Sequence, residues 1–311
     1  MTFPRLILMV LLSVECGFLV AQEPLTMISY NVENLFDCQH DTLKNDYSFL
    51  PDGDHYWTYH KYQTKLDRIA QVVVNISGWE SAALVGLCEV ENARCLRDLC
   101  YRLKRFHYRY VHYESEDERG IDVALLYDST KVKVLDSRPL RVDLNEDNTR
   151  DILYVKVLLH ERDTMYAMVC HLPSRLGGGA ATEWKRLKAK QVIQQQIDSI
   201  LHQQPQANIV VMGDMNDEAK NDLNGMSNQM VALEQVGQGT HKYQGVWSCL
   251  DQYYVSKELK DRVSVQIYSP EWLLEEDNKF LDYQPKRTFV GFRYHGGYSD
   301  HMPIVLTIMS K

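Results

Sequence analysis

The chain lacks the patterns that would place it in several common classes of protein. It has 311 residues and 7 cysteines, and none of the cysteines belongs to a CxxC pair or to a Cys/His pattern typical of a zinc site. We therefore expect no disulfide framework. There is no GxxxxGK[ST] loop, so we expect no nucleotide cofactor. The sequence also has no low-complexity linker and no internal repeat, which favours one domain over residues 22–311.

The chain has no excess of positive charge either. It contains 34 Lys and Arg residues against 42 Asp and Glu residues, which gives a formal net charge of −8. Proteins that coat nucleic acid gain most of their non-specific affinity from basic residues that neutralise phosphates. This excludes a packaging protein. It leaves room for an enzyme that contacts a few phosphates, because local fields matter more than the total charge.

A short apolar segment follows Arg5 at the N-terminus. It begins with residues 6–12, and the segment ends near the small residue Ala21. This pattern is typical of a secretory signal, so we predict a signal peptide over residues 1–21 and export to the periplasm or the medium. Glu15 interrupts the segment, which is too short for a stable membrane span. A single anchoring helix is the alternative. A lipid anchor on Cys16 is disfavoured because a glutamate precedes it.

Predicted strands and helices are mixed along the rest of the chain. Apolar runs predict strands at residues 25–30, 82–88, 121–127, 152–159, 165–170, 208–212, 252–255 and 304–308. Helical spacing predicts helices at residues 61–76, 92–103 and 183–201, the last with Thr182 as N-cap. These elements favour an α/β layered architecture. Residues 38–60 are polar and aromatic, and we expect a long surface loop that could cover a substrate.

Polar side chains stand where four of the predicted strands end. They are Asn31 and Glu33, then Glu89, then His171, then Asp214 and Asn216. Such groups are costly to bury unless they converge on a metal ion or on each other. Ligands also gather at the carboxyl ends of strands in many α/β folds. Oxygen donors without a thiolate suit a hard ion, and we therefore expect Mg²⁺ as the cofactor, with Mn²⁺ or Ca²⁺ as alternatives.

Five segments in order resemble the motifs of the endonuclease/exonuclease/phosphatase superfamily, which has the DNase I-like fold. Their sequences are NVENLFD at residues 31–37, GLCEVEN at 86–92, HLPSR at 171–175, GDMN at 213–216 and SDHMP at 299–303. The resemblance covers nearly all of the chain after residue 21. It implies a two-sheet β-sandwich flanked by helices in four layers, and a divalent-metal-dependent phosphodiester hydrolase.

The resemblance also implies a role for each residue at a matching position. Asp214 resembles the aspartate that positions or activates water, and Asn216 the residue that holds phosphate beside it. His301 resembles the histidine that contacts the scissile phosphate or acts as a base, and Asp251 the carboxylate that orients it. His171 matches a second histidine, which stabilises or protonates the leaving oxygen.

Two further groups of residues follow from the same resemblance. The implied metal ligands are Glu89, Asn31, Glu33 and Asp300. The implied substrate contacts are Arg150, Ser174, Arg175 and Asp122. The matches of Arg150 and Asp122 are weaker, and each could instead be a structural salt-bridge partner. We expect Glu91, beside these motifs, to be a solvated loop acid.

The expected partner is a phosphate ester, and three functions remain open. A monomeric nuclease acting on DNA or RNA comes first, because the pattern of two histidines resembles DNase-like members. The alternative is hydrolysis of a phospholipid head group or an inositol phosphate, since the aromatic segments 56–59 and 289–294 could meet a lipid surface as well as a base. A non-catalytic binding protein on the same scaffold is the third, and the intact motifs argue against it.

Overall fold

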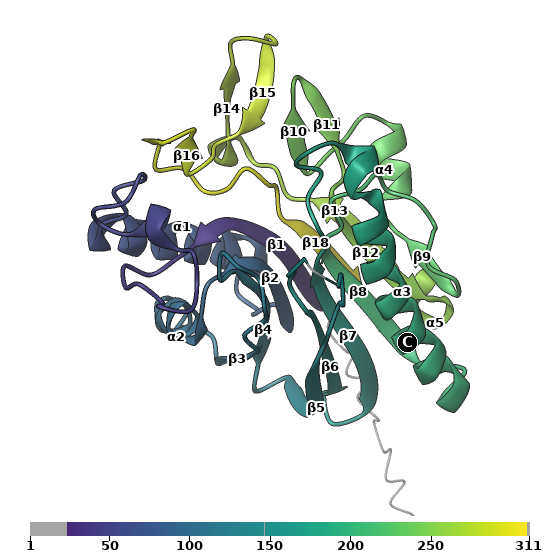
Figure 1. Ribbon diagram of the computed structural model, residues 1–311. Helices are drawn as coiled ribbons and strands as arrows, with labels where there is room; N and C mark the ends of the chain where they lie inside the picture. Colours follow the sequence, from purple (N-terminus) through teal and green to yellow (C-terminus); the bar gives the residue numbers. More distant parts are fainter. Residues whose placement is uncertain (1–23, 146, 310–311) are drawn as a thin grey trace, which may run out of the picture.

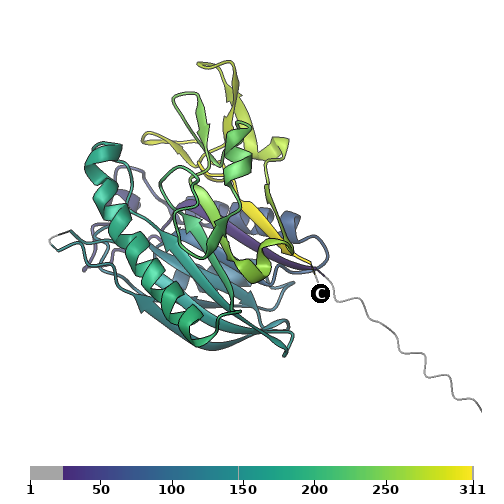
Figure 2. The ribbon, with the colours of Figure 1, turned by 90° about the vertical axis from the view of Figure 1, so that its right-hand side faces the viewer.

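Two large β-sheets lie face to face and are flanked by helices (Figures 1 and 2). The computed structural model describes residues 24–145 and 147–309. The predicted leader, residues 1–21, lies outside the described residues. The α/β sandwich predicted from the sequence is confirmed.

The first sheet has the strand order β13-β18-β1-β2-β4-β3. In that order the strands span Val263–Ile267, Ile304–Ile308, Leu25–Leu35, Leu84–Val90, Asp122–Asp128 and Tyr108–His112. Strands β1 and β2 are parallel, and β18 pairs antiparallel with β1 on one side and β13 on the other. The carboxyl ends of β1 and β2 therefore lie at the same edge of this sheet as the start of β18.

The second sheet has the strand order β5-β6-β7-β8-β12-β9. Its strands span Val132–Leu140, Ile152–Leu159, Asp163–His171, Asn208–Asp214, Asp251–Ser256 and Met226–Asn228. Strands β7 and β8 are parallel, whereas β12 runs antiparallel to β8. The ends of β7 and β8 and the start of β12 consequently share one edge.

Three long helices cover the outer faces of the sandwich. They are α1 (Tyr59–Ser77), α2 (Ala93–Arg102) and α3 (Gly179–Gln203). The short helices are η1 (Tyr47–Phe49), α4 (Val231–Gln235), α5 (Lys257–Lys260) and η2 (Glu271–Leu273). Three small hairpins pair their own strands: β10 (His241–Tyr243) with β11 (Val246–Ser248), β14 (Leu274–Asp277) with β15 (Asp282–Pro285), and β16 (Phe289–Val290) with β17 (Arg293–Tyr294).

Alternating side chains of the strands fill three apolar layers. Met27 of β1 points into the layer between the two sheets, together with Met212 of β8. The next residue, Ile28, points to the opposite face and packs with Leu66 of α1. The third layer joins the second sheet to α3, where Ile193 is fully buried. Burial on both faces explains why these strands are apolar almost throughout.

All eight predicted strands and all three predicted helices are present, with shifts at their ends. The predicted cap of α3 is wrong. The helix begins at Gly179 with Gly178 as N-cap, and the Thr182 hydroxyl donates to the carbonyl of Gly178 from inside the first turn. The loop over residues 38–60 is less exposed than expected. Trp57 is fully buried there, and its indole N–H donates to the Phe36 carbonyl at 2.8 Å.

The six cysteines in the described part of the chain are free, and Cys88, Cys95, Cys170 and Cys249 are buried. They act as small apolar side chains of the core. None of the helices described here combines the length and the apolarity needed to cross a bilayer.

Gly213 is expected to be irreplaceable at the end of β8. Its φ is +136°, and a Cβ atom at this position would lie 1.9 Å from the carbonyl oxygen of Cys170 on β7. Gly213→Ala should therefore lower the free energy of unfolding by about 2–4 kcal/mol through strain and overlap. Urea denaturation measures this. Gly237→Ala is the matched control, since Gly237 has a φ of +81° and open space around it.

The control separates the strain of a left-handed backbone, which both variants have, from the overlap with Cys170, which only Gly213→Ala has. Gly237→Ala should cost only about 1–2 kcal/mol, the strain of a left-handed residue. If the two variants lose the same stability, the contact between Gly213 and Cys170 is not what restricts this position.

Candidate active site

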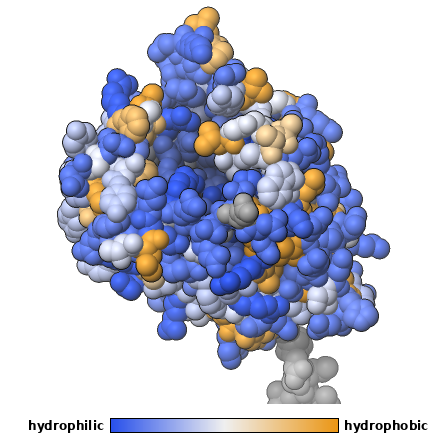
Figure 3. All heavy atoms as spheres, in the orientation of Figure 1, coloured by the Kyte–Doolittle hydropathy of each residue, from blue (hydrophilic) through white to orange (hydrophobic). Residues whose placement is uncertain are grey.

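The strand register brings three predicted catalytic residues into one row. In the second sheet, Asp214 is aligned with His171 on one side and with Asp251 on the other. Asn31 belongs to the facing sheet, where it is aligned with Cys88, the residue before Glu89. The molecule is hollowed on this face, and the hollow is lined largely by hydrophilic residues (Figure 3).

The Asp214 carboxylate is the centre of this group. Asn31 Nδ2 donates to Asp214 Oδ2 at 3.0 Å and lies 3.5 Å from Glu89 Oε1. His171 Nε2 lies 3.5 Å from Asp214 Oδ2 and 3.9 Å from the same Glu89 oxygen. Asn31 and His171 thus each lie between two carboxylates, that of Glu89 from the first sheet and that of Asp214 from the second.

His301 approaches Asp214 from the loop before β18. Its Nδ1 lies 2.7 Å from Asp251 Oδ2, and its Nε2 lies 3.8 Å from Asp214 Oδ2. Ser299 fixes the loop, because its hydroxyl donates to the Asn31 carbonyl at 2.7 Å and accepts from the His301 N–H at 3.1 Å. The imidazole is consequently held between two carboxylates.

Four residues at the strand ends have left-handed backbones. The φ angles are +52° at Glu33, +58° at Asn34, +67° at Glu89 and +48° at Asn216. The strand register is irregular between Asn31 and Leu35 and again at Glu89. Such bulges redirect side chains and store strain, and they gather at functional sites. They allow Glu89 to turn towards Asn31, although its neighbour Cys88 already faces the sandwich interior.

Burial and charge set the protonation of the central groups. Burial raises the pKa of Asp214 to about 7, with His301 lowering it and Asp251 raising it. Burial lowers the pKa of His301, but Asp251 and Asp214 outweigh burial and bring the pKa well above its ordinary value. Burial and then Arg150 hold the pKa of His171 well below its ordinary value. The pKa values of the two histidines beside Asp214 are thus shifted in opposite directions.

The description "Endonuclease/Exonuclease/phosphatase family" fits residues 26–310 of the sequence. The chain belongs to this family. Among curated proteins, none has a matching sequence.

Solved structures of the same fold support the architecture. Truncated TDP2 from Caenorhabditis elegans is 16% identical, with 92% of this chain and 98% of that chain covered and a TM-score of 0.62. TDP2 from D. rerio complexed with single strand DNA product is 19% identical, with coverage of 93% and 100% and a TM-score of 0.57. The mannosyl-6-phosphatase from Bacteroides thetaiotaomicron is 14% identical, with coverage of 92% and 100% and a TM-score of 0.58.

Members of the endonuclease/exonuclease/phosphatase family generally use divalent metals, and the donors here fit one. The Glu89 side chain is 15% exposed, and its Oε2 accepts the N–H of Asn34 at 2.9 Å. Its Oε1 stays close to Asn31 and His171. Asp300, His301 and His241 form a group whose ligand atoms lie within 4.8 Å of one another. Glu89, Asn31 and Asp300 remain the predicted ligands in this family member.

Glu33 has other partners than the predicted metal. Its two carboxylate oxygens accept the N–H groups of Thr288 and Phe289, at 2.6 and 3.2 Å. The buried ammonium of Lys65 donates to the Thr288 hydroxyl and, at 2.7 Å, to the Tyr298 carbonyl. Glu33 thereby anchors the hairpin β16–β17 beside the site.

The predicted substrate contacts are arranged around the site rather than at its centre. Arg150 pairs with Asp117 at 3.0 Å and donates to the carbonyls of His171 and Leu172, which fixes the end of β7. Arg175 donates to the Asn216 carbonyl at 2.9 Å and is partly exposed. Ser174 is exposed near it.

Two other predicted residues have defined contacts. The backbone N–H of Asn216 donates to Asp214 Oδ1 at 2.8 Å, and its side-chain amide donates to the Leu172 carbonyl at 3.0 Å. Asp122 accepts the Ser115 N–H at 3.2 Å, in a loop that follows β3. The Asp122 side chain therefore belongs to a different cluster from Asp214.

His241 is the functional candidate that the sequence did not reveal. It bridges to His301 in an antiparallel pair, and the two ring centroids lie 4.8 Å apart. Met302 N–H donates to the Thr240 carbonyl at 2.7 Å, which fixes the hairpin β10–β11 next to the site. A histidine in a short, polar strand gives no periodic signal, so only its spatial position identifies it.

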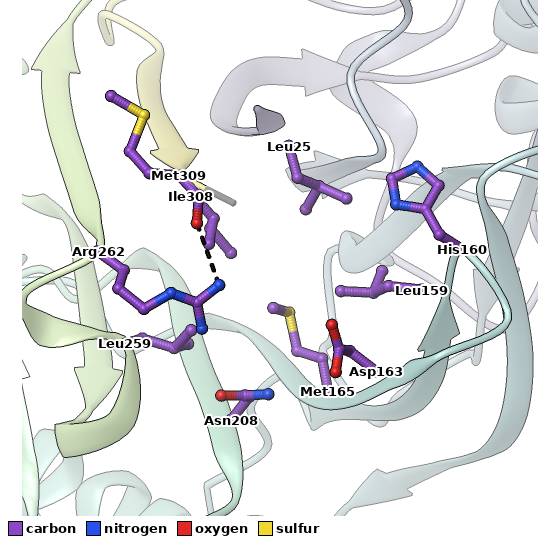
Figure 4. Close-up of a pocket in the computed structure, with 10 residues that line it drawn as sticks. All are labelled: Leu25, Leu159, His160, Asp163, Met165, Asn208, Leu259, Arg262, Ile308 and Met309. Carbon is purple, nitrogen blue, oxygen red and sulfur yellow. Dashed lines mark hydrogen bonds between the residues drawn. The ribbon is translucent and has the colours of Figure 1, made fainter. Parts of the chain in front are cut away.

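A separate pocket lies at the opposite edge of the sheets (Figure 4). It is lined by residues such as Leu25 at the start of β1 and Ile308 at the end of β18. Arg262 in its wall donates to the Met309 carbonyl at 3.0 Å. None of the residues that line this pocket comes from the five motifs.

Proposed function

We propose that this chain is a divalent-metal-dependent phosphodiester hydrolase that acts as a nuclease on single-stranded DNA or RNA. The observation that carries the proposal is the placement of Asp214 Oδ2 between two imidazole rings, 3.5 Å from His171 Nε2 and 3.8 Å from His301 Nε2. Asp251 holds His301 at 2.7 Å and outweighs burial in raising its pKa, whereas burial lowers the pKa of His171. Groups of these kinds can assist both the attacking and the leaving oxygen of a phosphodiester.

Each residue has one task in this proposal. Asp214, with a pKa of about 7, accepts a proton from the attacking water. The cationic ring of His301 donates its Nε2–H to a phosphoryl oxygen on which negative charge develops. The ring of His171 donates an N–H hydrogen bond to the leaving oxygen and so stabilises its negative charge, and the leaving oxygen takes its proton from solvent water. Asn31 keeps Asp214 and Glu89 in place.

A divalent ion bound by Glu89, Asn31 and Asp300 would neutralise phosphate charge. The residues of the chain supply the buried surroundings and the fixed charges of the site. The group is buried between two sheets, where the charged contacts are screened less than in water. Positioned dipoles and charges in such a site are usually the largest contribution to catalysis.

Exposed aromatic residues beside the site favour a nucleic acid strand as substrate. Phe292 in the hairpin β16–β17 is 68% exposed. Tyr56, in the loop over residues 38–60, is 67% exposed. His55 of that loop packs against Phe292 with ring centroids 5.4 Å apart. Aromatic faces bind unpaired bases of any sequence. The solved D. rerio TDP2 holds a single strand DNA product, which supports the same substrate class.

Removal of the metal is expected to silence the enzyme. With Mg²⁺, single-stranded DNA or RNA should be cleaved, and excess EDTA should lower the rate by at least about 100-fold because the phosphate charge is no longer neutralised. Added Mg²⁺ or Mn²⁺ should restore the rate. A gel assay on labelled oligonucleotides measures this, alongside plasmid DNA, sphingomyelin, inositol phosphates, a phosphomonoester and bis-p-nitrophenyl phosphate.

The substrate panel separates the alternatives. Hydrolysis of sphingomyelin or inositol phosphates without cleavage of nucleic acid would contradict the nuclease and support the lipid or inositol reading. Activity that survives EDTA would contradict the metal requirement. A chain that hydrolyses none of these esters with any of the ions would be a binding protein on this scaffold.

A further inference from the structure

A second group of potential metal ligands lies outside the candidate active site. His112 is the last residue of β3, Asp122 is the first residue of β4, and Glu114 lies in the loop between them. Ligand atoms of the three side chains all lie within 4.8 Å of one another. His112 Nε2 is 3.7 Å from Asp122 Oδ2, and His112 Nδ1 is 3.8 Å from Glu114 Oε1.

Two atoms in this group are buried without a hydrogen-bond partner in the described part of the chain. They are His112 Nε2 and Asp122 Oδ2, and the two side chains are only 3% and 2% exposed. Buried polar atoms are nearly always satisfied in folded proteins. The 3.7 Å between these two atoms is too long for a hydrogen bond. It is compatible with a shared ion about 2 Å from each atom.

The donor types in the group are those found in metal sites. An imidazole nitrogen and carboxylate oxygens each offer a lone pair to a divalent ion once they are deprotonated. The ammonium group of Lys44 donates to the carbonyls of Ser115 and Asp117, at 2.7 and 2.9 Å.

We propose that His112, Glu114 and Asp122 bind one transition-metal ion of the zinc or manganese class at a site separate from the candidate active site. One imidazole and two carboxylates form a mixed donor set that suits these ions better than Ca²⁺ or Mg²⁺. Three protein ligands leave one position for water. The site does not depend on the proposed nuclease activity.

The proposed ion ties together a loop that supports the active site. Within residues 113–121, the Ser115 N–H donates to Asp122, and Asp117 pairs with Arg150 at 3.0 Å. Arg150 in turn donates to the backbone carbonyl of His171. Metal at His112 therefore stabilises the loop and, through Arg150, the end of β7, without contact with the reacting groups.

Metal titration of the full chain tests the site. The parent protein carries Glu89→Gln and Asp300→Asn, which weaken the candidate catalytic metal site, and is stripped with EDTA and dialysed. Titration with Zn²⁺ alone, and separately with Mn²⁺ alone, is followed by calorimetry and by elemental analysis. We expect one tightly bound ion per chain for at least one of the two metals.

The deciding variant is Glu114→Gln, because the Glu114 side chain is 54% exposed and its loss leaves the buried packing intact. It should weaken the affinity by about 10- to 100-fold, and His112→Gln should remove binding. Glu118→Gln, an exposed acid of the same loop, is the control and should bind like the parent. Equal melting temperatures of the parent and Glu114→Gln in EDTA show that the fold is unaffected.

Thermal melting gives a second measure. Zn²⁺ at about 100 times its Kd should raise the Tm of the parent by about 4 °C, and the same concentration should raise the Tm of Glu114→Gln far less. The proposal is overturned if the parent binds neither metal. It is also overturned if Glu114→Gln and Glu118→Gln bind with equal affinity.

Discussion

Asp214→Asn is expected to lower kcat/KM for a phosphodiester by about 10³- to 10⁴-fold while the chain stays folded. The substitution keeps the shape of the side chain and removes the group that accepts the proton of water. Burial raises the pKa of Asp214 above its unfolded value, so the folded state loses stability as the pH rises through about 7. Asn cannot ionise, and the Tm at pH 8 in EDTA should equal or exceed that of the unchanged chain.

Glu218→Gln provides the control for Asp214→Asn. Glu218 is an exposed acid soon after Asp214 in the chain, and it pairs only weakly with Lys220 at 3.3 Å. This variant should keep its activity within about twofold, because surface ion pairs contribute little. Turnover near that of the unchanged chain in Asp214→Asn would remove this residue from the mechanism. Activity and Tm are measured on the same preparations.

His301 and Asp251 are expected to act as one unit. His301→Gln should lower kcat by about 10³-fold and Asp251→Asn by about 10²-fold, because Asp251 acts mainly through the ring that it holds at 2.7 Å. The double variant should then be no slower than His301→Gln alone. Single-turnover rates of the four proteins measure the coupling. If the two losses multiply, Asp251 has a task of its own.

The pH profile distinguishes orientation from simple damage to the fold. Asp251 raises the pKa of His301, and the cationic ring is the form proposed to contact phosphate. Activity therefore declines above this pKa. Without the Asp251 charge the pKa of His301 falls, so the decline on the alkaline side should move to lower pH in Asp251→Asn. A merely destabilised protein would keep the original profile at reduced amplitude.

The sequence predicted much of the sandwich because its strands are covered on both faces. Runs such as residues 209–212 are apolar throughout, and the polar residues soon after several of these runs mark the carboxyl edge. The pairing of Asp251 with His301 also followed from the resemblance, although the residues are 50 positions apart. Their hydrogen bond is present, while their catalytic roles remain predictions.

Other features depend on backbone geometry that residue types do not reveal. Nothing in the sequence around Glu89 indicates that its backbone is left-handed. Glu91 was expected to be solvated, yet it is buried and its Oε2 accepts the Asp37 N–H at 2.6 Å. Glu33 likewise satisfies backbone N–H groups of a distant hairpin. An acid next to a motif cannot be assigned until the chain that packs over it is known.

The short hairpins were missed for a different reason. Strands such as β10, His241–Tyr243, are too short to show an alternating pattern. Their positions depend on long-range contacts, for example the bridge from His241 to His301. The edge strand β5, Val132–Leu140, was missed because much of it is exposed.

The position of β18 in the first sheet means that the candidate active site is completed only late in synthesis and folding. This strand lies inside the first sheet, between β13 and β1, although it comes after all other described strands in the chain. A growing polypeptide can form local elements early, but non-local pairings such as Leu25 with Ile308 must wait for the whole intervening chain. His301 directly precedes this strand. We therefore expect a nascent or truncated chain that ends before β18 to lack the proposed activity, which should arise only when the strand inserts.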